Sequence, residues 1–297
     1  MTTEEITKAI VPLGGLATRF LPVSRVLPKE FLPLADKPLL HYALEELKNA
    51  GIREVVFIVN SRSKEAILHY FRRDTELEKV LEERKRDELL ELLKDIDALG
   101  KAMHFLYVQQ KEPLGDGHAV LQAAKLVGDN AFVLLYPDDV IESKIPCTAQ
   151  LMRVYKTAQK PVQALYRLKK EQLSGYGVVG IETIAHRLYK IKKIVEKPSS
   201  PEAIPSDLAV VGRRILTSEV FEYLKKAHPN KKGEIVLSEV LGEMVRDGKI
   251  VYGYEIEGRW WECGTMEHWL RSQTYFTLKH PEYGKNIQKF LKEEKLL

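Results

Sequence analysis

Two glycines directly follow an apolar run near the start of the chain, in the segment KAIVPLGG that ends at Gly15. Glycine lets backbone N–H groups approach phosphate oxygens without a side chain in the way. Arginine and lysine supply the positive charge that phosphates need. The loop therefore predicts an anion site, with a polyphosphate as the expected ligand, and a tight turn with solvated cations is the alternative. The residues concerned are Gly14, Gly15, Thr18, Arg19, Arg25 and Lys29.

A second candidate group lies at the end of another apolar run, AFVLLYPDD, which spans 131–139. The run ends in Asp138 and Asp139. A hard divalent cation takes oxygen ligands and leaves its other coordination positions for substrate phosphates, so an acidic pair suits Mg²⁺. An aspartate at a strand end also commonly caps a turn, and the pair alone does not separate these two interpretations.

Amide and glycine residues occur together in QQKEPLGDGHAV, at 109–120. A glutamine side chain can read a nucleobase edge because it both donates and accepts hydrogen bonds. An ordinary connection from a strand to a helix is an equally good interpretation, and His118 is expected to be structural rather than a catalytic base. Glu196 and Lys197 in VEKP are neighbours on a predicted strand, so we expect them on opposite faces and not as a simple ion pair.

The elements that must position these residues alternate between strand-like and helix-like segments. This alternation predicts an α/β fold with a mostly parallel sheet covered on both faces. Ligands of such sheets bind at the carboxyl ends of the strands, so the glycine loop and Asp138 should meet in one cleft. Strands are predicted at 8–13, 54–60, 103–110, 131–139, 162–168, 189–198 and 207–216, with a strand pair, or a strand and a turn, in 250–264. Helical structure is predicted at 38–51, 63–99, 219–227, 238–248, 268–280 and 286–297.

Composition narrows the class of protein. The chain has 297 residues and a net charge of +4, from 46 basic and 42 acidic residues, which is too even for a nucleic-acid binder. Cys147 and Cys263 are far apart and are expected to be reduced thiols. The first residues do not have the pattern of a signal peptide, and no run is long enough for a membrane span, so we expect a cytoplasmic protein.

Taken together and in this order, these segments resemble the sugar-1-phosphate nucleotidyltransferases, and most closely the bacterial UTP–glucose-1-phosphate uridylyltransferase family. The resemblance extends from about Lys8 to about Trp269, and the combination of PKE-x-LPL-x-DKP with VEKP is specific. It implies a Rossmann-like mixed, mostly parallel central sheet flanked by helices. The segments that carry it are PLGGLATRFLP, PKEFLPLADKPLLHYALEE, GHAVLQA, LLYPDDV, GYGVV, VEKP, LAVVGRRIL, GEIVLSE and ECGT.

The resemblance implies in-line attack of glucose 1-phosphate on the α-phosphorus of UTP, which releases pyrophosphate and gives UDP-glucose with the help of Mg²⁺. It implies no nucleic-acid or membrane partner, and a homodimer or homotetramer. We expect one domain over 1–297, with a nucleotide- and sugar-binding core at about 8–225 and a helical C-terminal part at about 226–297. Two alternatives stay open. One is a relative that uses dTTP or another sugar 1-phosphate, and the other is a catalytically weak homologue that binds nucleotide as a regulator.

The resemblance also implies a role for each matching residue. It places Gly14, Gly15, Thr18 and Arg19 at the UTP phosphates, Lys29 at the reacting phosphates, Gln110 and Gly115 at uracil, Gly177 and Glu196 at the glucose hydroxyls, Lys197 at the sugar phosphate, and Asp138 and Glu262 at Mg²⁺.

The sequence departs from the family pattern at several positions. Ala17 replaces a glycine, and its methyl group is expected to crowd the phosphates unless φ is negative there. Glu262 and Glu239 replace aspartates and are one methylene longer. Trp260 and Trp261 also replace family residues. Because Mg²⁺ demands near-ideal geometry, these changes bear on rate, metal preference and sugar choice more than on the fold.

Overall fold

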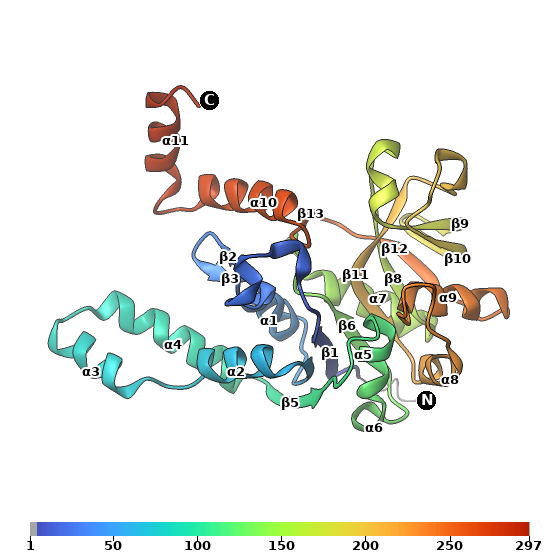
Figure 1. Cartoon of the computed structure of the whole chain (residues 1–297), viewed down its shortest axis with the longest axis horizontal. Helices are drawn as coiled ribbons and strands as arrows, with labels where there is room; N and C mark the ends of the chain where they lie inside the picture. The colour runs from blue at the N-terminus through green and yellow to red at the C-terminus, as the bar shows by residue number, and fades with distance from the viewer. Residues whose placement is uncertain (1–4, 297) are drawn as a thin grey trace.

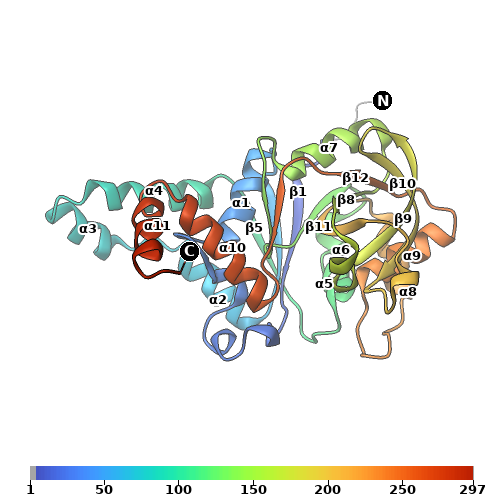
Figure 2. The ribbon, with the colours of Figure 1, turned by 90° about the horizontal axis from the view of Figure 1, so that it is seen from above.

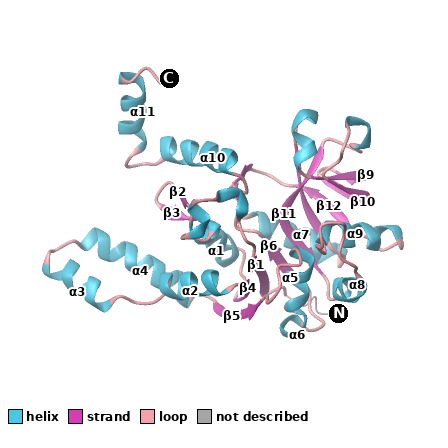
Figure 3. Ribbon diagram, viewed as in Figure 1, coloured by secondary structure: helices cyan, strands magenta, loops and turns pink. Residues whose placement is uncertain are grey.

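A nine-stranded sheet forms the centre of the computed structural model, which describes residues 5–296 (Figures 1 and 3). Its inner strands are continuous apolar runs because helices bury them on both faces. In order across the sheet, the strands are β5 (His104–Gln109), β4 (Glu54–Val59), β1 (Lys8–Leu13), β6 (Phe132–Leu135), β11 (Leu208–Leu216), β8 (Val162–Arg167), β12 (Tyr252–Glu255), β10 (Leu188–Glu196) and β9 (Gly177–Ala185).

The two halves of the sheet differ in strand direction. The strands β5, β4, β1 and β6 are parallel to one another. In the other half, β11 is antiparallel to β6 and β8, β12 is parallel to β8, and β10 is antiparallel to β12 and β9. The sheet is therefore mixed, with its parallel strands concentrated in the N-terminal half. The loops after β1 and β6 leave this half at the same edge, as predicted.

Alternate side chains of the central strands enter two apolar layers, one on each face of the sheet. Val11 packs in one layer with Leu44 and Leu151, and Ile10 packs in the other with Val120 and Phe221. The first layer is covered by α1 (Leu39–Asn49), α2 (Ser61–Tyr70) and α7 (Cys147–Ala158), and the second by α5 (Asp116–Gln122), α6 (Ala124–Val127), α8 (Glu219–Lys226) and α9 (Leu237–Arg246). The sequence pattern did not indicate α7 or β9.

The charged stretch 63–99 is helical, as predicted, and the structure divides it among three helices. After α2, the chain forms α3 (Thr75–Glu83) and α4 (Asp87–Lys101), which project from the body as an arm (Figure 2). Asp74 begins α3 because its side chain accepts a hydrogen bond from the N–H of Leu77 at 3.0 Å. Lys85 takes a left-handed conformation at φ 54 and reverses the chain between α3 and α4.

The last third of the chain contributes strands as well as helices. Within 226–297, β12 joins the middle of the central sheet, so this part of the chain is not only helical. The predicted strand pair exists, but its members do not pair with each other, because β13 (Arg259–Glu262) pairs with β7 (Asp139–Glu142). α10 (Met266–Lys279) and α11 (Gly284–Glu293) follow and extend away from the sheet (Figure 1).

Short elements complete the part of the chain near the glycine loop. They are η1 (Thr18–Phe20), η2 (Val23–Arg25), η3 (Lys29–Phe31), β2 (Pro33–Leu34) and β3 (Lys37–Pro38). η4 (Lys170–Gly175) and η5 (Pro201–Ala203) lie in the half of the molecule that contains β9 and β10. No helix within residues 5–296 has the length and apolar character to cross a membrane.

Candidate functional site

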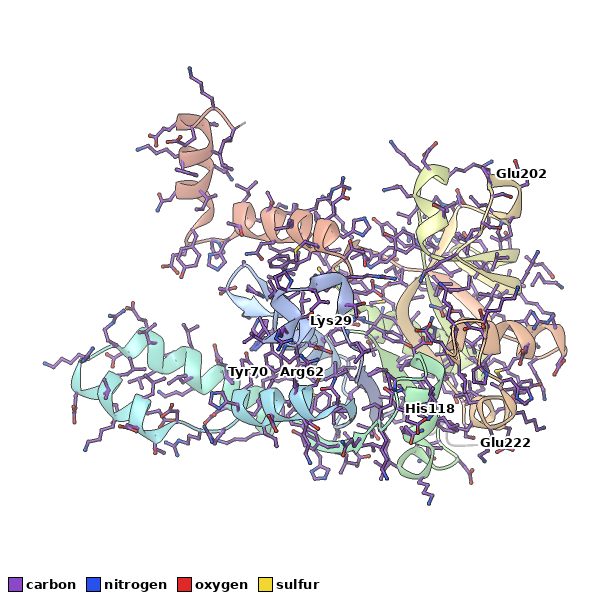
Figure 4. All side chains as sticks on the ribbon, viewed as in Figure 1. Lys29, Arg62, Tyr70, His118, Glu202 and Glu222 are labelled. Atoms are coloured by element: carbon purple, nitrogen blue, oxygen red, sulfur yellow. The ribbon has the colours of Figure 1, made fainter. Side chains whose placement is uncertain are left out.

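The loop after β1 forms one wall of a pocket of about 320 Å³ at the carboxyl edge of the sheet. Other walls come from η3 and from the connection between β5 and α5. In Figure 4, Lys29 lies near the middle of the molecule and His118 lies on α5. The fold thus brings together sequence-predicted residues from three separate segments: Gly14, Gly15, Thr18, Lys29, Gln110 and Gly115 all line this pocket.

Close packing explains why two positions of the pocket are glycine. A Cβ atom on Gly14 would lie 2.6 Å from Oε1 of Gln110, and one on Gly115 would lie 2.6 Å from the carbonyl oxygen of Ile235. Gly115 also has φ +97, which favours glycine. Gly15 is different because no atom lies within 4 Å of its Cβ position. The open space beside the loop is therefore at Gly15.

Hydrogen bonds hold Gln110 at the back of the pocket. Its Nε2 donates to the carbonyl of Gly115 at 3.2 Å and lies 3.2 Å from Nδ1 of His118. The other ring nitrogen of His118 lies 3.0 Å from Nε2 of Gln122. His118 is thus engaged by two glutamine amides, which agrees with the structural role expected for it.

Ala17 takes the left-handed conformation, with φ 52 and ψ 38. This conformation costs an alanine roughly 1 kcal/mol relative to the right-handed one. The N–H of Phe20 donates to the carbonyl of Ala17 at 3.0 Å and closes the following turn. The sequence left the sign of φ open at this position, and the structure shows a positive φ, where glycine would be favoured.

The two arginines of the loop, Arg19 and Arg25, lie outside the pocket. Arg19 is exposed on η1 and Arg25 is exposed on η2, and neither lines the pocket. The carbonyl of Arg25 accepts a hydrogen bond from Arg62 at 3.2 Å. Lys29 is therefore the cation of this segment that lines the pocket.

Lys29 and Asp138 form an ion pair, with Nζ 2.6 Å from Oδ2. Burial opposes the charge on Lys29, but Asp138 and Glu30 outweigh it, so the pKa of Lys29 lies above its ordinary value. Burial alone would likewise raise the pKa of Asp138, but the Lys29 ammonium outweighs it and this pKa is lowered. Both groups therefore carry their charges at neutral pH, as an anion site and a metal ligand require.

Glu262 comes from a distant part of the chain and faces Asp138. A Cβ atom on Gly264 would lie 2.5 Å from Oε1 of Glu262 and 3.2 Å from Oδ2 of Asp138. Any side chain at this glycine would fill the space between the two carboxylates. The pairing of β13 with β7, which sets Glu262 opposite Asp139, delivers Glu262 to this place.

The two carboxylates fit Mg²⁺, which is commonly held by one or two carboxylates together with water and substrate phosphates. Among residues 5–296 no group of three or more His, Cys, Asp or Glu side chains surrounds a common point. Asp138 and Glu262 would supply only part of the shell of a Mg²⁺ ion and would leave the remaining positions to water and substrate phosphates.

Asp139 has a different role from its neighbour. Its Oδ1 accepts a hydrogen bond from Nε1 of Trp260 at 2.6 Å, and its Oδ2 accepts from the N–H of Gly212 at 2.8 Å. Burial and the adjacent Asp138 raise the pKa of Asp139 to about 6. Its two oxygens are bonded to β11 and β13, so Asp139 joins β7 to both strands, whereas Asp138 is paired with Lys29 and faces Glu262.

Gly177, Glu196 and Lys197 form a second group, which does not line the pocket. Gly177 lies directly opposite Glu196 in the β9–β10 pairing, and its Cβ position is 3.0 Å from Oε2 of Glu196. Lys197 lies beyond the strand end at φ 45, and its Nζ is 3.7 Å from Oε1 of Glu196. The expectation that these two charges point apart was wrong, because strand alternation stops at Glu196.

Aromatic residues connect this second group to the carboxylate pair. The carbonyl of Tyr176 accepts a hydrogen bond from the N–H of Lys197 at 3.1 Å. The Tyr176 ring meets Trp260 at 5.0 Å and is stacked with His268 at 6.5 Å between ring centroids. Trp260 bonds Asp139, and His268 contacts Glu262. A chain of contacts therefore links the second group to the carboxylates.

Several residues around the site were missed by sequence reasoning. Tyr136 donates to Oδ2 of Asp116 at 2.8 Å, and Oδ1 of Asp116 accepts from the N–H groups of Gly117 and Leu237. Arg213 is buried, donates to Glu46 and also to the carbonyl of Tyr136 at 2.6 Å. These bonds fix the start of α5 and the turn before Asp138. The position of Asp116 between two glycines was a sequence signal for its hydrogen bonds. No local signal pointed to the hydrogen bonds of Arg213.

Glu239 and the cysteines lie outside these contacts. Glu239 is exposed in the first turn of α9 and does not line the pocket. Cys147 and Cys263 are both buried free thiols, as expected. Burial raises the pKa of Cys263 to about 12, so this thiol stays protonated between Glu262 and Gly264.

The comparisons with known proteins identify the family of the chain. Residues 8–277 match the model of the family described as nucleotidyl transferase. The UTP–glucose-1-phosphate uridylyltransferase of Staphylococcus haemolyticus is 37% identical over 290 residues, which cover 98% of this chain and 99% of that protein. One of Staphylococcus saprophyticus is 36% identical over 288 residues, covering 97% of this chain and 98% of that protein.

Solved structures give the same result. A UDP-glucose pyrophosphorylase complexed with UDP-glucose has a TM-score of 0.83 at 33% identity, covering 93% of this chain and all of that chain. The UTP-bound enzyme of Acinetobacter baumannii has a TM-score of 0.85 at 30% identity, covering 97% of this chain and 99% of that chain. The chain therefore belongs to the nucleotidyl transferase family, among the relatives of the UTP–glucose-1-phosphate uridylyltransferases.

Proposed function

We propose that this chain joins UTP and glucose 1-phosphate to give UDP-glucose and pyrophosphate. The observation that carries the proposal is the placement of Lys29, which lines the pocket beside Gly15 and is paired with Asp138. Lys29 lies between the pocket, whose glycine loop suits the phosphates of a nucleotide, and the carboxylate pair, whose oxygens suit Mg²⁺. The names of the similar enzymes from Staphylococcus and Acinetobacter support the same reaction.

In the proposed reaction, a phosphate oxygen of glucose 1-phosphate forms a bond to the α-phosphorus of UTP. The bond between this phosphorus and the oxygen bridging to the β-phosphate breaks, and pyrophosphate leaves. No protein nucleophile is needed, so the protein contributes positioning and charge. Bound to Asp138 and Glu262, Mg²⁺ would supply positive charge next to the phosphates.

We assign the residues of the pocket to UTP. Gln110 and Gly115 face uracil, and the backbone at Gly14, Gly15 and Thr18 receives the phosphates. Lys29 neutralises the charge that develops at the reacting phosphate, since its ammonium is already held there by Asp138. Arg19 is exposed in the ligand-free chain, and its proposed contact with the phosphates requires its side chain to turn toward them.

The second group is assigned to the sugar phosphate. Glu196 accepts hydrogen bonds from glucose hydroxyls, and the lack of a side chain at Gly177 leaves the sugar room beside it. Lys197 neutralises the phosphate of glucose 1-phosphate. Its partly exposed ammonium, 3.7 Å from Glu196, is available for a phosphate because that ion pair is loose.

Pyrophosphate release tests this proposal, with Mg²⁺, glucose 1-phosphate and each nucleoside triphosphate in turn. We expect turnover with UTP and little with ATP, CTP or GTP. A preference for dTTP or for another sugar 1-phosphate would keep the mechanism and correct the substrate. No turnover with any pair, despite measurable UTP binding, would replace the enzyme with a regulatory homologue.

The assembly and location of the protein belong to the same proposal. We propose a homo-oligomer, either a dimer or a tetramer, in which the extended α10 and α11 are available for contacts between copies. Light scattering behind a sizing column gives its mass directly, and a monomer would overturn it. The substrates and the two free thiols fit the cytoplasm.

A further inference from the structure

The carboxylate of Glu262 is held at both oxygens by residues that follow it in the chain. Its Oε1 accepts a hydrogen bond from the N–H of Gly264 at 2.7 Å. Its Oε2 contacts Nδ1 of His268, in the first turn of α10. The first oxygen is the one that faces Asp138 across Gly264. The contact of His268 with the second oxygen can therefore set the orientation of the carboxylate.

His268 is itself fixed in place. Its N–H donates to the side chain of Thr265 at 3.2 Å, which caps α10. Its ring lies nearly parallel to Tyr176, at 14° and 6.5 Å between centroids. The side chain is partly exposed, at 36%, whereas that of Glu262 is at 18%. A ring anchored by a helix cap and a stacked aromatic can hold a partner more rigidly than a free surface side chain.

The length of Glu262 makes such a partner necessary. Its carboxylate turns about one more bond than that of an aspartate at the same place, so more freedom must be lost before it can face Asp138. Mg²⁺ tolerates poor ligand geometry badly. Groups that fix the orientation of a ligand are worth a large part of the affinity of a metal site.

We propose that His268 is a positioning residue for the metal site, which holds Glu262 so that its Oε1 faces Asp138. The proposal rests on the proposed function, because it takes Asp138 and Glu262 as the ligands of Mg²⁺. His268 touches neither metal nor substrate in this role. It acts by donating its Nδ1–H to Oε2 of Glu262, and it compensates for the extra methylene of that side chain.

The test measures Mn²⁺ binding by electron paramagnetic resonance, with UTP present and glucose 1-phosphate absent, so that no turnover occurs. For His268→Ala we expect binding weakened by about 10–100-fold, the range for losing a group that orients a ligand. His268→Asn keeps an N–H donor near the position of Nδ1 and should recover most of the affinity. Glu267→Gln, at the exposed neighbour on α10, is the matched control and should bind as the native chain does.

A double substitution makes the test specific. In a Glu262→Asp background the carboxylate is shorter and does not need His268, so adding His268→Ala should change Mn²⁺ binding less than threefold. A full additive loss in this background would overturn the proposal, and so would unchanged binding in His268→Ala alone. Circular dichroism melting of each variant separates a lost contact from a lost fold.

The same measurement separates a failure of the proposed metal site from a failure of the positioning role of His268. If the native chain with UTP binds no Mn²⁺, the metal site of the proposed function is wrong and the role of His268 is wrong with it. If the native chain binds Mn²⁺ and His268→Ala binds it equally well, only the positioning role is wrong. Activation constants for Mg²⁺ in turnover should follow the binding data, with kcat at saturating metal nearly unchanged.

Discussion

The pocket beside Gly15 and the carboxylate pair at Gly264 are neighbours, but the chain builds them differently. The pocket is mostly backbone: Gly14, Gly15 and Gly115 leave room, and Lys29 supplies the charge. The carboxylate pair consists of one side chain in the turn before β7 and one at the end of β13, each held by a partner. The shape of the backbone pocket is fixed once the strands of the sheet have formed. The carboxylate pair depends instead on side-chain contacts that a single substitution can remove.

The same contrast separates the two groups proposed for the substrates. Lys29 is partly buried and lies 2.6 Å from Asp138, whereas Lys197 is more exposed and lies 3.7 Å from Glu196. An ion pair that is held close and partly shielded from water contributes more than one exposed to it. Loss of the cation on the nucleotide side should therefore have a larger effect than loss of the one on the sugar side, and the first two predictions below test that order.

The largest effect is expected for Lys29→Ala. This change removes a preorganised cation and leaves Asp138 without its partner, so kcat should fall by about 10²–10³-fold. Steady-state pyrophosphate release at saturating substrates measures it. Lys48→Ala, at an exposed position on α1, is the control. A loss of less than tenfold with the fold intact would remove Lys29 from the reacting phosphates and erase the contrast.

Lys197→Ala should have a smaller and more selective effect. A lost charge-assisted contact with the sugar phosphate should raise KM for glucose 1-phosphate by about 10-fold, with KM for UTP nearly unchanged. Lys192→Ala, at an exposed position on β10 itself, is the control. Equal changes in both KM values would show that the two groups do not serve separate substrates.

Glu30 gives the nucleotide side a pH dependence of stability. Its side chain is buried, with Oε1 unpartnered among the described residues, and burial raises its pKa to about 7 from 4.5. The folded state therefore binds this proton more tightly than the unfolded state. Between pH 4.5 and 7 the free energy of unfolding should fall as pH rises, by on the order of 2 kcal/mol from this group.

Urea unfolding at a series of pH values measures this slope. Glu30→Gln cannot ionise and should flatten it, whereas Glu88→Gln, at an exposed position on α4, should leave it as it is. If the slope of Glu30→Gln equals that of the native chain, the buried carboxyl does not ionise in this range.

The smallest effect is expected for Ala17→Gly. Glycine relieves the left-handed strain, but it also increases the entropy of the unfolded chain, so the free energy of unfolding should rise by only about 0.5 kcal/mol. Ala98→Gly, at an exposed position in helix α4, should instead lower it by about 1 kcal/mol. If Ala17→Gly destabilises to the same extent, the backbone at Ala17 is not strained.

The sequence predicted the backbone pocket better than the side chains around it. Glycines, strand runs and the lysine after them are local signals, and the parallel strands β1 and β6 brought them together as expected. The partners of the carboxylates have no such signal. Whether Asp138 or Asp139 stays open depends on Trp260 and Gly212, which the chain supplies far from both.

The features that the sequence pattern did not reveal have equally specific causes. The stretch 63–99 has helical periodicity throughout, so only the capping side chain of Asp74 and the left-handed Lys85 show where the helices end. Lys197 was placed by strand alternation, which cannot indicate the residue at which a strand stops. The contact of His268 with Glu262 joins a strand end to the next helix across a turn, and its geometry follows only from the structure.

The insertion of β12 between β8 and β10 has a consequence for how the molecule is made. β12 pairs residue 252 with residue 162, and β13 pairs residue 262 with residue 139. The parallel strands up to β6 pair with one another and can associate while the chain is still being synthesised, although α8 and α9, which cover one of their faces, are made later. The junction of β8 with β10 and the second carboxylate must wait for β12 and β13, which come last. A ribosome-bound chain halted before residue 250 should therefore lack a complete metal site, which makes the proposed activity depend on the strands that are made last.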